Sequence, residues 1–331
     1  MTEMAMHQAD TARLGARARG NAIRRFAASD NFFRRLTQSA ALVVLLILGG
    51  VIFSMIQGSI PAFREFGFGF FTTEVWNPVT EKYGAGAAIF GTLVTSTIAM
   101  VIAVPVGIGI AIFLTELCPP PLRRPIGIAI ELLAGIPSII YGIWGLFVFA
   151  PFLQQYVQPA LIAAFGHVPV LSSVFAGPPY GIGMLTASLI LAIMVLPFVT
   201  SISRDVFQTT PPMLKESAYG LGCTTWEVVS NIVIPFTRVG VIGGVMLGLG
   251  RALGETMAVT FVIGNAHKIS ASLLAPGTTI SATIANEFTE AVGDLYTSSL
   301  IALGLILFMI TFVVLALARF MLMRLEIKAG A

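Results

Sequence analysis

Apolar residues in this chain gather into six long runs, separated by more polar stretches. The runs lie at about 39–56, 88–114, 126–149, 183–202, 239–263 and 298–321. A helix needs roughly 20 apolar residues to cross a hydrocarbon layer about 30 Å thick, and each run approaches or exceeds that length. The runs lack the alternation of barrel strands, and a helix satisfies its own backbone hydrogen bonds in lipid. The pattern predicts an all-α membrane protein with six transmembrane helices.

The composition and the charges agree with this prediction and orient the helices. Of the 331 residues, 56% are hydrophobic and 11% are charged, which leaves too little polar surface for a soluble globule. Fifteen of the 19 Lys and Arg residues precede the first run, separate runs two and three or four and five, or end the chain from residue 319 onward. Because basic residues favour the cytosolic side, we expect both termini in the cytosol and the first run as an uncleaved anchor. This bias explains the basic residues, so no nucleic-acid partner is predicted.

Two opposite charges, Arg251 and Glu255, interrupt the fifth run within GLGRALGETMAV at 248–259. A charge at membrane depth costs about 2.5–3.5 kcal/mol, so each is expected to pair or to face water. Four residues apart, the two share one face of a predicted helix, and Arg251 falls about 18 Å into the layer, near its midplane. Two interpretations stay open. The pair either fixes the bundle internally, or lines a path in which the planar Arg251 fork meets two oxygens of an anion and Glu255 holds that fork.

The connection between runs four and five reads PPMLKESAYGLGCTTWEVVSNIVIP at 211–235. Its two leading prolines can open a helix and its glycines can end one. The segment therefore predicts a short helix with a glycine elbow along the inner membrane face. On local chemistry alone, a plain amphipathic linker is an equally good interpretation.

The spacing within this connection resembles the inner-face signature of importer permeases in the ATP-binding cassette (ABC) superfamily. That signature is Glu-Ala-Ala, three residues, Gly, nine residues and Ile-x-Leu-Pro. The segment 216–218 matches its start, Gly222 and residues 232–235 follow at the expected spacing, and Ser217 and Ile234 are mild departures. The resemblance implies that residues 213–222 form a coupling helix in a cleft of a separate ATPase subunit. Its candidate coupling residues are Lys215, Glu216, Ser217, Ala218 and Gly222.

Three further segments, at 131–145, 248–265 and 276–288, resemble the permeases of phosphate-specific ABC importers. The resemblance implies the type I ABC importer permease fold and a subunit that forms half of the path for inorganic phosphate across the bacterial inner membrane. Besides phosphate and membrane lipid, the implied partners are a homologous permease (PstA), two ATP-binding subunits (PstB) and a periplasmic phosphate-binding protein (PstS). No cofactor is implied. The chain lacks a Gly-Lys-Ser or Gly-Lys-Thr phosphate loop, so we expect ATP hydrolysis in the partner subunits and no enzymatic activity here.

These inferences divide the chain into four parts. We expect a basic cytosolic tail at 1–38, the first transmembrane helix with an outward loop at 39–85, the permease core at 86–322 and a second cytosolic tail at 323–331. Long outward segments at 57–87, 150–182 and 264–297 are candidates for docking an external binding protein. Two alternatives stay open: a permease for another oxyanion, such as phosphonate, sulfate or molybdate, and an ATP-independent transporter or channel.

Overall fold

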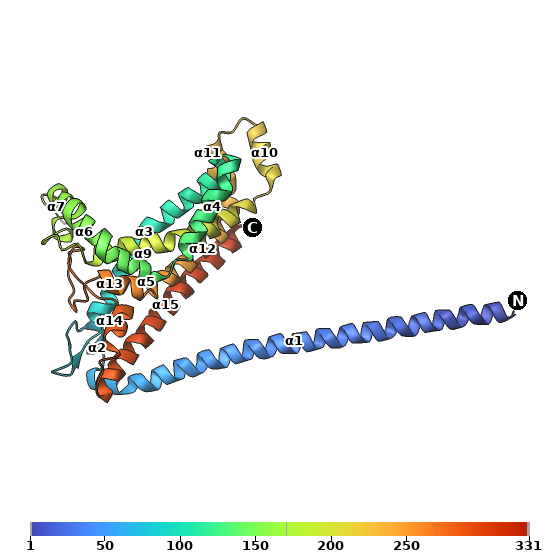
Figure 1. The fold of residues 1–331 in the computed structure, drawn as a ribbon, viewed down its shortest axis with the longest axis horizontal. Helices are drawn as coiled ribbons and strands as arrows, with labels where there is room; N and C mark the ends of the chain where they lie inside the picture. Colours follow the sequence, from blue (N-terminus) through green and yellow to red (C-terminus); the bar gives the residue numbers. More distant parts are fainter. Residues whose placement is uncertain (1, 170, 330–331) are drawn as a thin grey trace. The chain divides into compact units, whose positions relative to one another are not determined.

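The computed structural model of the protein describes residues 2–169 and 171–329, and Figure 1 shows its ribbon. The ends of the two predicted tails, residue 1 and residues 330–331, lie outside the described residues. The chain divides into two compact units, Met1–Gln57 and Gly58–Ala331. The first unit is the amino-terminal part of one helix, α1 (Thr2–Phe66). Its stretch from Asp30 is long and apolar enough to cross a membrane.

The second unit, called the C-terminal unit below, is built almost entirely from helices. After α1 come α2 (Gly69–Thr72), strands β1 (Trp76–Asn77) and β2 (Lys82–Tyr83), α3 (Gly86–Ile112), α4 (Pro120–Ala134), α5 (Ser138–Trp144), α6 (Ala150–Phe152), α7 (Gln158–Phe165), α8 (Leu171–Val174), α9 (Met184–Gln208), α10 (Pro212–Gly220), α11 (Thr225–Val228), α12 (Ile234–Leu253), α13 (Met257–Val262), α14 (Ile280–Glu287) and α15 (Asp294–Ala329). Within the described part of the chain, π-helical segments Phe113–Leu117, Gly145–Phe149, Leu153–Val157 and Val229–Val233 continue α3, α5, α6 and α11.

Six helical stretches among the described residues are long and apolar enough to cross a membrane. They are Asp30–Phe66, Gly86–Leu117, Ser138–Phe165, Met184–Gln208, Thr225–Leu253 and Asp294–Phe320. Each overlaps one of the six predicted runs, which confirms the all-α membrane fold with six spans. The third and fifth stretches differ from their predicted positions, and both differences arise where the chain breaks a helix.

The third run is broken by the sequence Gly-Ile-Pro at 135–137. Pro137 adopts an extended backbone (φ −56°, ψ 136°), and its ring cannot continue the hydrogen bonds of α4. The Tyr141 hydroxyl donates to the Leu133 carbonyl at 2.9 Å and so ties the two sides of the break together. The membrane-long stretch begins only at Ser138 and ends at Phe165. About half of the predicted outward segment at 150–182 is therefore helix.

Helix α9 forms the centre of the C-terminal unit and is the most buried of the six stretches. It packs along α3 and α12, and the approach to α12 is close because glycines line the contact. A Cβ added at Gly240 would lie 2.5 Å from Val206, and one added at Gly244 would lie 2.8 Å from Ile202. Glycines four positions apart thus let the two spans touch.

Two ends of the C-terminal unit carry the shorter elements. Helices α10 and α11 lie at one end, and α2 and α14 lie at the other (Figure 1). At the second end, β1 and β2 pair as an antiparallel hairpin with Trp76 opposite Tyr83. Both aromatic rings are buried with Phe70 and Tyr296 in one apolar cluster. The hairpin is therefore a packed element within the predicted outward loop at 57–87.

Candidate functional site

The fifth span ends abruptly at the two charges that interrupt its sequence. Helix α12 stops at Leu253, Gly254 leaves helical geometry (φ −96°, ψ 2°), and α13 starts only at Met257. Arg251 lies in the last turn of α12, where the negative end of the helix dipole favours a cation. The prediction that Arg251 and Glu255 share a face of one continuous helix is therefore wrong. A glycine, which lacks a stabilising side chain, ends the helix between them.

Contact between the two charges is nevertheless confirmed. An Arg251 guanidinium nitrogen, Nη2, lies 3.9 Å from Glu255 Oε2. The guanidinium carbon also lies 4.7 Å from the centre of the Phe198 ring on α9, which is cation–π distance. Arg251 Nε is buried and has no hydrogen-bond partner among the described residues. The guanidinium is thus held in place while some of its N–H groups stay available.

Glu255 is fixed more firmly than its partner. Only 8% of the residue is exposed, whereas 35% of the Arg251 side chain is. Its second carboxylate oxygen, Oε1, accepts a hydrogen bond of 3.4 Å from the backbone N–H of Ala258 in the first turn of α13. A carboxylate is favourable at that position because the first N–H groups of a helix lack partners within it. The Glu255 carboxylate is thus held in place, whereas 35% of the Arg251 side chain stays exposed. A second anion can therefore approach Arg251.

The predicted short helix with a glycine elbow forms at 212–220 as α10. Pro211 precedes it, and Gly222 follows it with φ +89°, in the left-handed region that favours glycine. The Gly222 N–H donates to the Tyr219 carbonyl at 3.0 Å and the Cys223 N–H donates to the Ala218 carbonyl at 3.1 Å. These two bonds form a Schellman motif. The local fold of the segment is as predicted.

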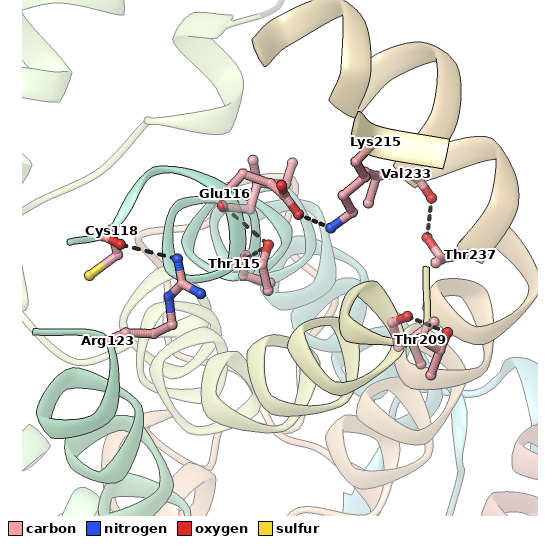
Figure 2. Close-up of polar contacts among 11 residues, drawn as sticks. Thr115, Glu116, Cys118, Arg123, Thr209, Lys215, Val233 and Thr237 are labelled. Atoms are coloured by element: carbon pink, nitrogen blue, oxygen red, sulfur yellow. Dashed lines mark hydrogen bonds and ion pairs between the residues drawn. The ribbon is translucent and has the colours of Figure 1, made fainter. Parts of the chain in front are cut away.

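The candidate coupling residues divide between two faces of α10. Glu216, Ser217 and Gly222 are exposed, whereas Ala218 is buried. Lys215 turns inward and pairs with Glu116 at the end of α3, with 2.5 Å between Nζ and Oε1 (Figure 2). The exposed residues are available to another subunit. Lys215 and Ala218 instead attach the helix to the rest of the chain.

The opposite end of the unit brings two predicted outward segments together. The Trp76 indole stacks on His267 with ring centres 5.6 Å apart, and its N–H donates to Glu287 Oε2 at 3.3 Å. Glu287 also accepts a hydrogen bond from the Tyr296 hydroxyl. The Ile269 N–H donates to Glu74 Oε2 at 2.8 Å. Residues of 57–87 and 264–297 therefore form one continuous surface region.

Two opposing effects act on the pKa of His267 in this region. Burial lowers the pKa of the His267 imidazole, while the Glu287 carboxylate 3.5 Å away acts in the opposite direction and does not prevail. The imidazole is therefore favoured in its neutral form, stacked against Trp76.

Comparison with known proteins places these features in a family. The family described as "Binding-protein-dependent transport system inner membrane component" matches residues 103–326, from the middle of α3 into α15. The chain belongs to this family. It is a multi-pass inner membrane component of a transport system, and its first span lies outside the matched region.

Several relatives of this inner membrane component carry the same description. This chain is 69% identical over 314 residues to a phosphate transport system permease protein PstC of Mesorhizobium japonicum. The alignment covers 95% of this chain and 96% of the relative. A PstC of Haemophilus influenzae is 54% identical and covers 91% and 95%. A protein of Methanocaldococcus jannaschii described as a probable PstC is 39% identical and covers 85% and 90%.

Two solved ABC transporters share the fold of this inner membrane component. An inward-facing structure of the MetNI methionine transporter covers 72% of this chain and 94% of its own, with a TM-score of 0.55 at 14% identity. A bacterial transporter that imports the acidic polysaccharide alginate covers 86% and 95%, with a TM-score of 0.51 at 18% identity. The type I importer permease fold is thereby confirmed.

Two residues at the candidate sites were not predicted from the sequence. Phe198 is one apolar residue among many in the fourth run, and no pattern marks its ring as the partner of Arg251. Glu116 does give a signal, because a carboxylate closes the second apolar run, but its partner Lys215 lies 99 positions away. Only the fold, which brings Lys215 of α10 next to the end of the second span, puts that pair together.

Proposed function

We propose that this inner membrane component is the permease subunit of an ATP-driven phosphate importer and forms half of the path for inorganic phosphate. This proposal rests on relatives that are 54–69% identical and match over nearly their whole length. Each is named a phosphate transport system permease protein. Arg251 supports it as well, because its side chain is 35% exposed at a helix break and a guanidinium suits an anion.

In the proposed path, two phosphate oxygens meet the planar guanidinium of Arg251, which matches their spacing as a point charge does not. Phe198 and Glu255 keep the guanidinium in place when the path is empty. Glu255 also competes with phosphate for the same N–H groups. A transported anion must leave its contact again, and a neighbouring fixed carboxylate limits how tightly it is held.

The proposed complex contains a homologous permease, PstA, two ATP-binding subunits, PstB, and a periplasmic phosphate-binding protein, PstS. ATP hydrolysis takes place in the ATP-binding subunits, which receive the exposed face of α10 with Glu216 and Ser217. The binding protein docks on the region formed by 57–87 and 264–297.

Reconstitution of the complete complex in phospholipid vesicles tests the proposal. With ATP on the cytosolic side and loaded binding protein outside, radiolabelled phosphate should accumulate, and sulfate, molybdate and phosphonate should not compete at equal concentration. Accumulation of another oxyanion in place of phosphate would contradict the substrate. Uptake without ATP or without the ATP-binding subunits would instead favour a transporter or channel that works alone.

A further inference from the structure

Lys215 and Glu116 form a shielded ion pair between the short helix α10 and the end of the second span. The pair joins Nζ and Oε1 at 2.5 Å, and Figure 2 shows the two side chains pointing toward each other. Only 8% of the Glu116 side chain and 19% of the Lys215 side chain are exposed. Solvent therefore screens this pair much less than an exposed surface pair.

The Glu116 side of the contact is stiffened by its own segment. Glu116 lies in the π-helical turn Phe113–Leu117, and such turns recur at functional positions. The Thr115 hydroxyl donates to the Ala111 carbonyl at 3.0 Å, one turn earlier. Beyond the turn, Arg123 Nη2 donates to the Cys118 carbonyl at 3.2 Å (Figure 2). The Glu116 carboxylate therefore lies on a segment, at the end of the second span, that local hydrogen bonds hold in place.

On the Lys215 side, α10 also packs against α11 and the π-helical segment Val229–Val233. Ala218 is the buried residue of α10, and it lies three positions after Lys215 on the same helical face. Its single methyl group offers a small apolar contact. The side chains of Met213, Leu214 and Tyr219 are exposed. Besides this apolar packing, the ion pair gives α10 a direct charged link to the end of the second span.

We infer that the Lys215–Glu116 pair positions α10 and carries its movement into α3. The inference rests on the proposed function, in which an ATPase subunit binds the exposed face of α10. From α3 the movement reaches α9, which packs along it, and α9 carries the Phe198 ring that faces Arg251. A charged contact of this length resists both pushing and pulling, whereas an apolar contact resists pulling only weakly. Lys215 and Glu116 are thus positioning residues for coupling.

The test compares four variants of the complete complex in vesicles. Glu116→Gln and Lys215→Gln each break the pair, and the exchange of Glu116→Lys with Lys215→Glu restores opposite charges. Glu131→Gln is the matched control, because it removes a 2.7 Å ion pair with Arg204 between α4 and α9 without touching α10. The measured quantity is substrate transported per ATP hydrolysed in assembled complex, together with ATPase stimulation by the loaded binding protein.

Both single variants should lower the transport ratio roughly five-fold or more, the exchange should recover most of it, and the control should leave it near the wild-type value. Wild-type ratios in both single variants would overturn the inference, as would an exchange no better than either single variant. If a single variant fails to assemble, the exchange still decides, and its failure counts against the pair. A wild-type complex that carries another oxyanion contradicts the proposed substrate only, because binding-protein stimulation can be measured with any transported anion.

Discussion

At the scale of single residues, Arg251 combines a fixed position with unused hydrogen-bonding capacity. Its distance of 3.9 Å from Glu255 exceeds the 2.7–3.2 Å usual for an N–H···O hydrogen bond, so the pair is electrostatic and loose. The Phe198 ring and the end of α12 supply further stabilisation of the cation without occupying its N–H groups. This arrangement suits a reversible anion contact better than a permanent structural bridge.

Replacing Arg251 should therefore abolish uptake without preventing assembly. Arg251→Ala removes the cation and leaves Glu255 to repel the anion, which costs about 3 kcal/mol or more and lowers uptake roughly a hundred-fold. Arg251→Lys should retain part of the activity, because a point charge cannot form the bidentate contact. Arg319→Ala, which removes an exposed cation of α15, serves as the control. Uptake is measured at equal amounts of assembled complex, and near-normal uptake by Arg251→Ala would contradict the assignment.

At the scale of elements, the existence of each span could be predicted from the sequence better than the residues at which its helix begins and ends. Length and apolar content were enough to predict six spans, and two prolines with Gly222 were enough to predict α10. The two broken spans were missed because an apolar run reads the same whether or not its helix is continuous. A glycine inside a helix is common, and Gly248 and Gly250 lie within α12 without breaking it, so the break at Gly254 could not be predicted from its residue type. At the start of α13, the Glu255 carboxylate accepts a hydrogen bond from the Ala258 N–H three positions later, a local contact that the apolar content of the run does not reveal.

The glycine elbow of α10 should be sensitive to backbone conformation rather than to space. Gly222 has φ +89°, and nothing lies within 4 Å of a Cβ added there. Gly222→Val should cost about 1–2 kcal/mol locally, tilt α10 and reduce ATPase stimulation by loaded binding protein. Gly222→Asn should be much milder, because Asn visits the left-handed region. Equal stimulation in the wild type and in Gly222→Val would show that the elbow is not needed for coupling.

The aromatic region at the outer end should lose stability in mild acid. Because burial lowers the pKa of His267, the unfolded chain binds a proton below about pH 6.5 that the folded chain still excludes. Stability from this group is complete above that pH and falls as the pH drops toward the folded pKa. The unfolding midpoint, measured by tryptophan fluorescence, should therefore drop less between pH 7 and pH 5 in His267→Gln than in the wild type. Parallel curves for the two proteins would contradict this role of His267.

At the scale of the whole molecule, the C-terminal unit separates the two proposed partner surfaces. Exposed Val79 and Val292 belong to the predicted outward segments, and exposed Leu221 follows α10. Cysteines placed at 79 and 292 should crosslink to the periplasmic binding protein and react with a reagent that cannot cross the membrane. A cysteine at 221 should do neither from outside and should crosslink to an ATPase subunit. Labelling of 221 from outside would reverse the predicted orientation of the termini.

In the proposed path, Arg251 contacts the transported anion rather than only pairing with Glu255. The most direct measurement is phosphate uptake by the assembled double variant Arg251→Ala with Glu255→Ala. Removing both charges leaves no uncompensated charge behind, so a purely structural pair should be dispensable in this background. We predict normal assembly, normal docking of the binding protein and no uptake. Wild-type uptake by the double variant would contradict the claim and leave the pair with a structural role alone.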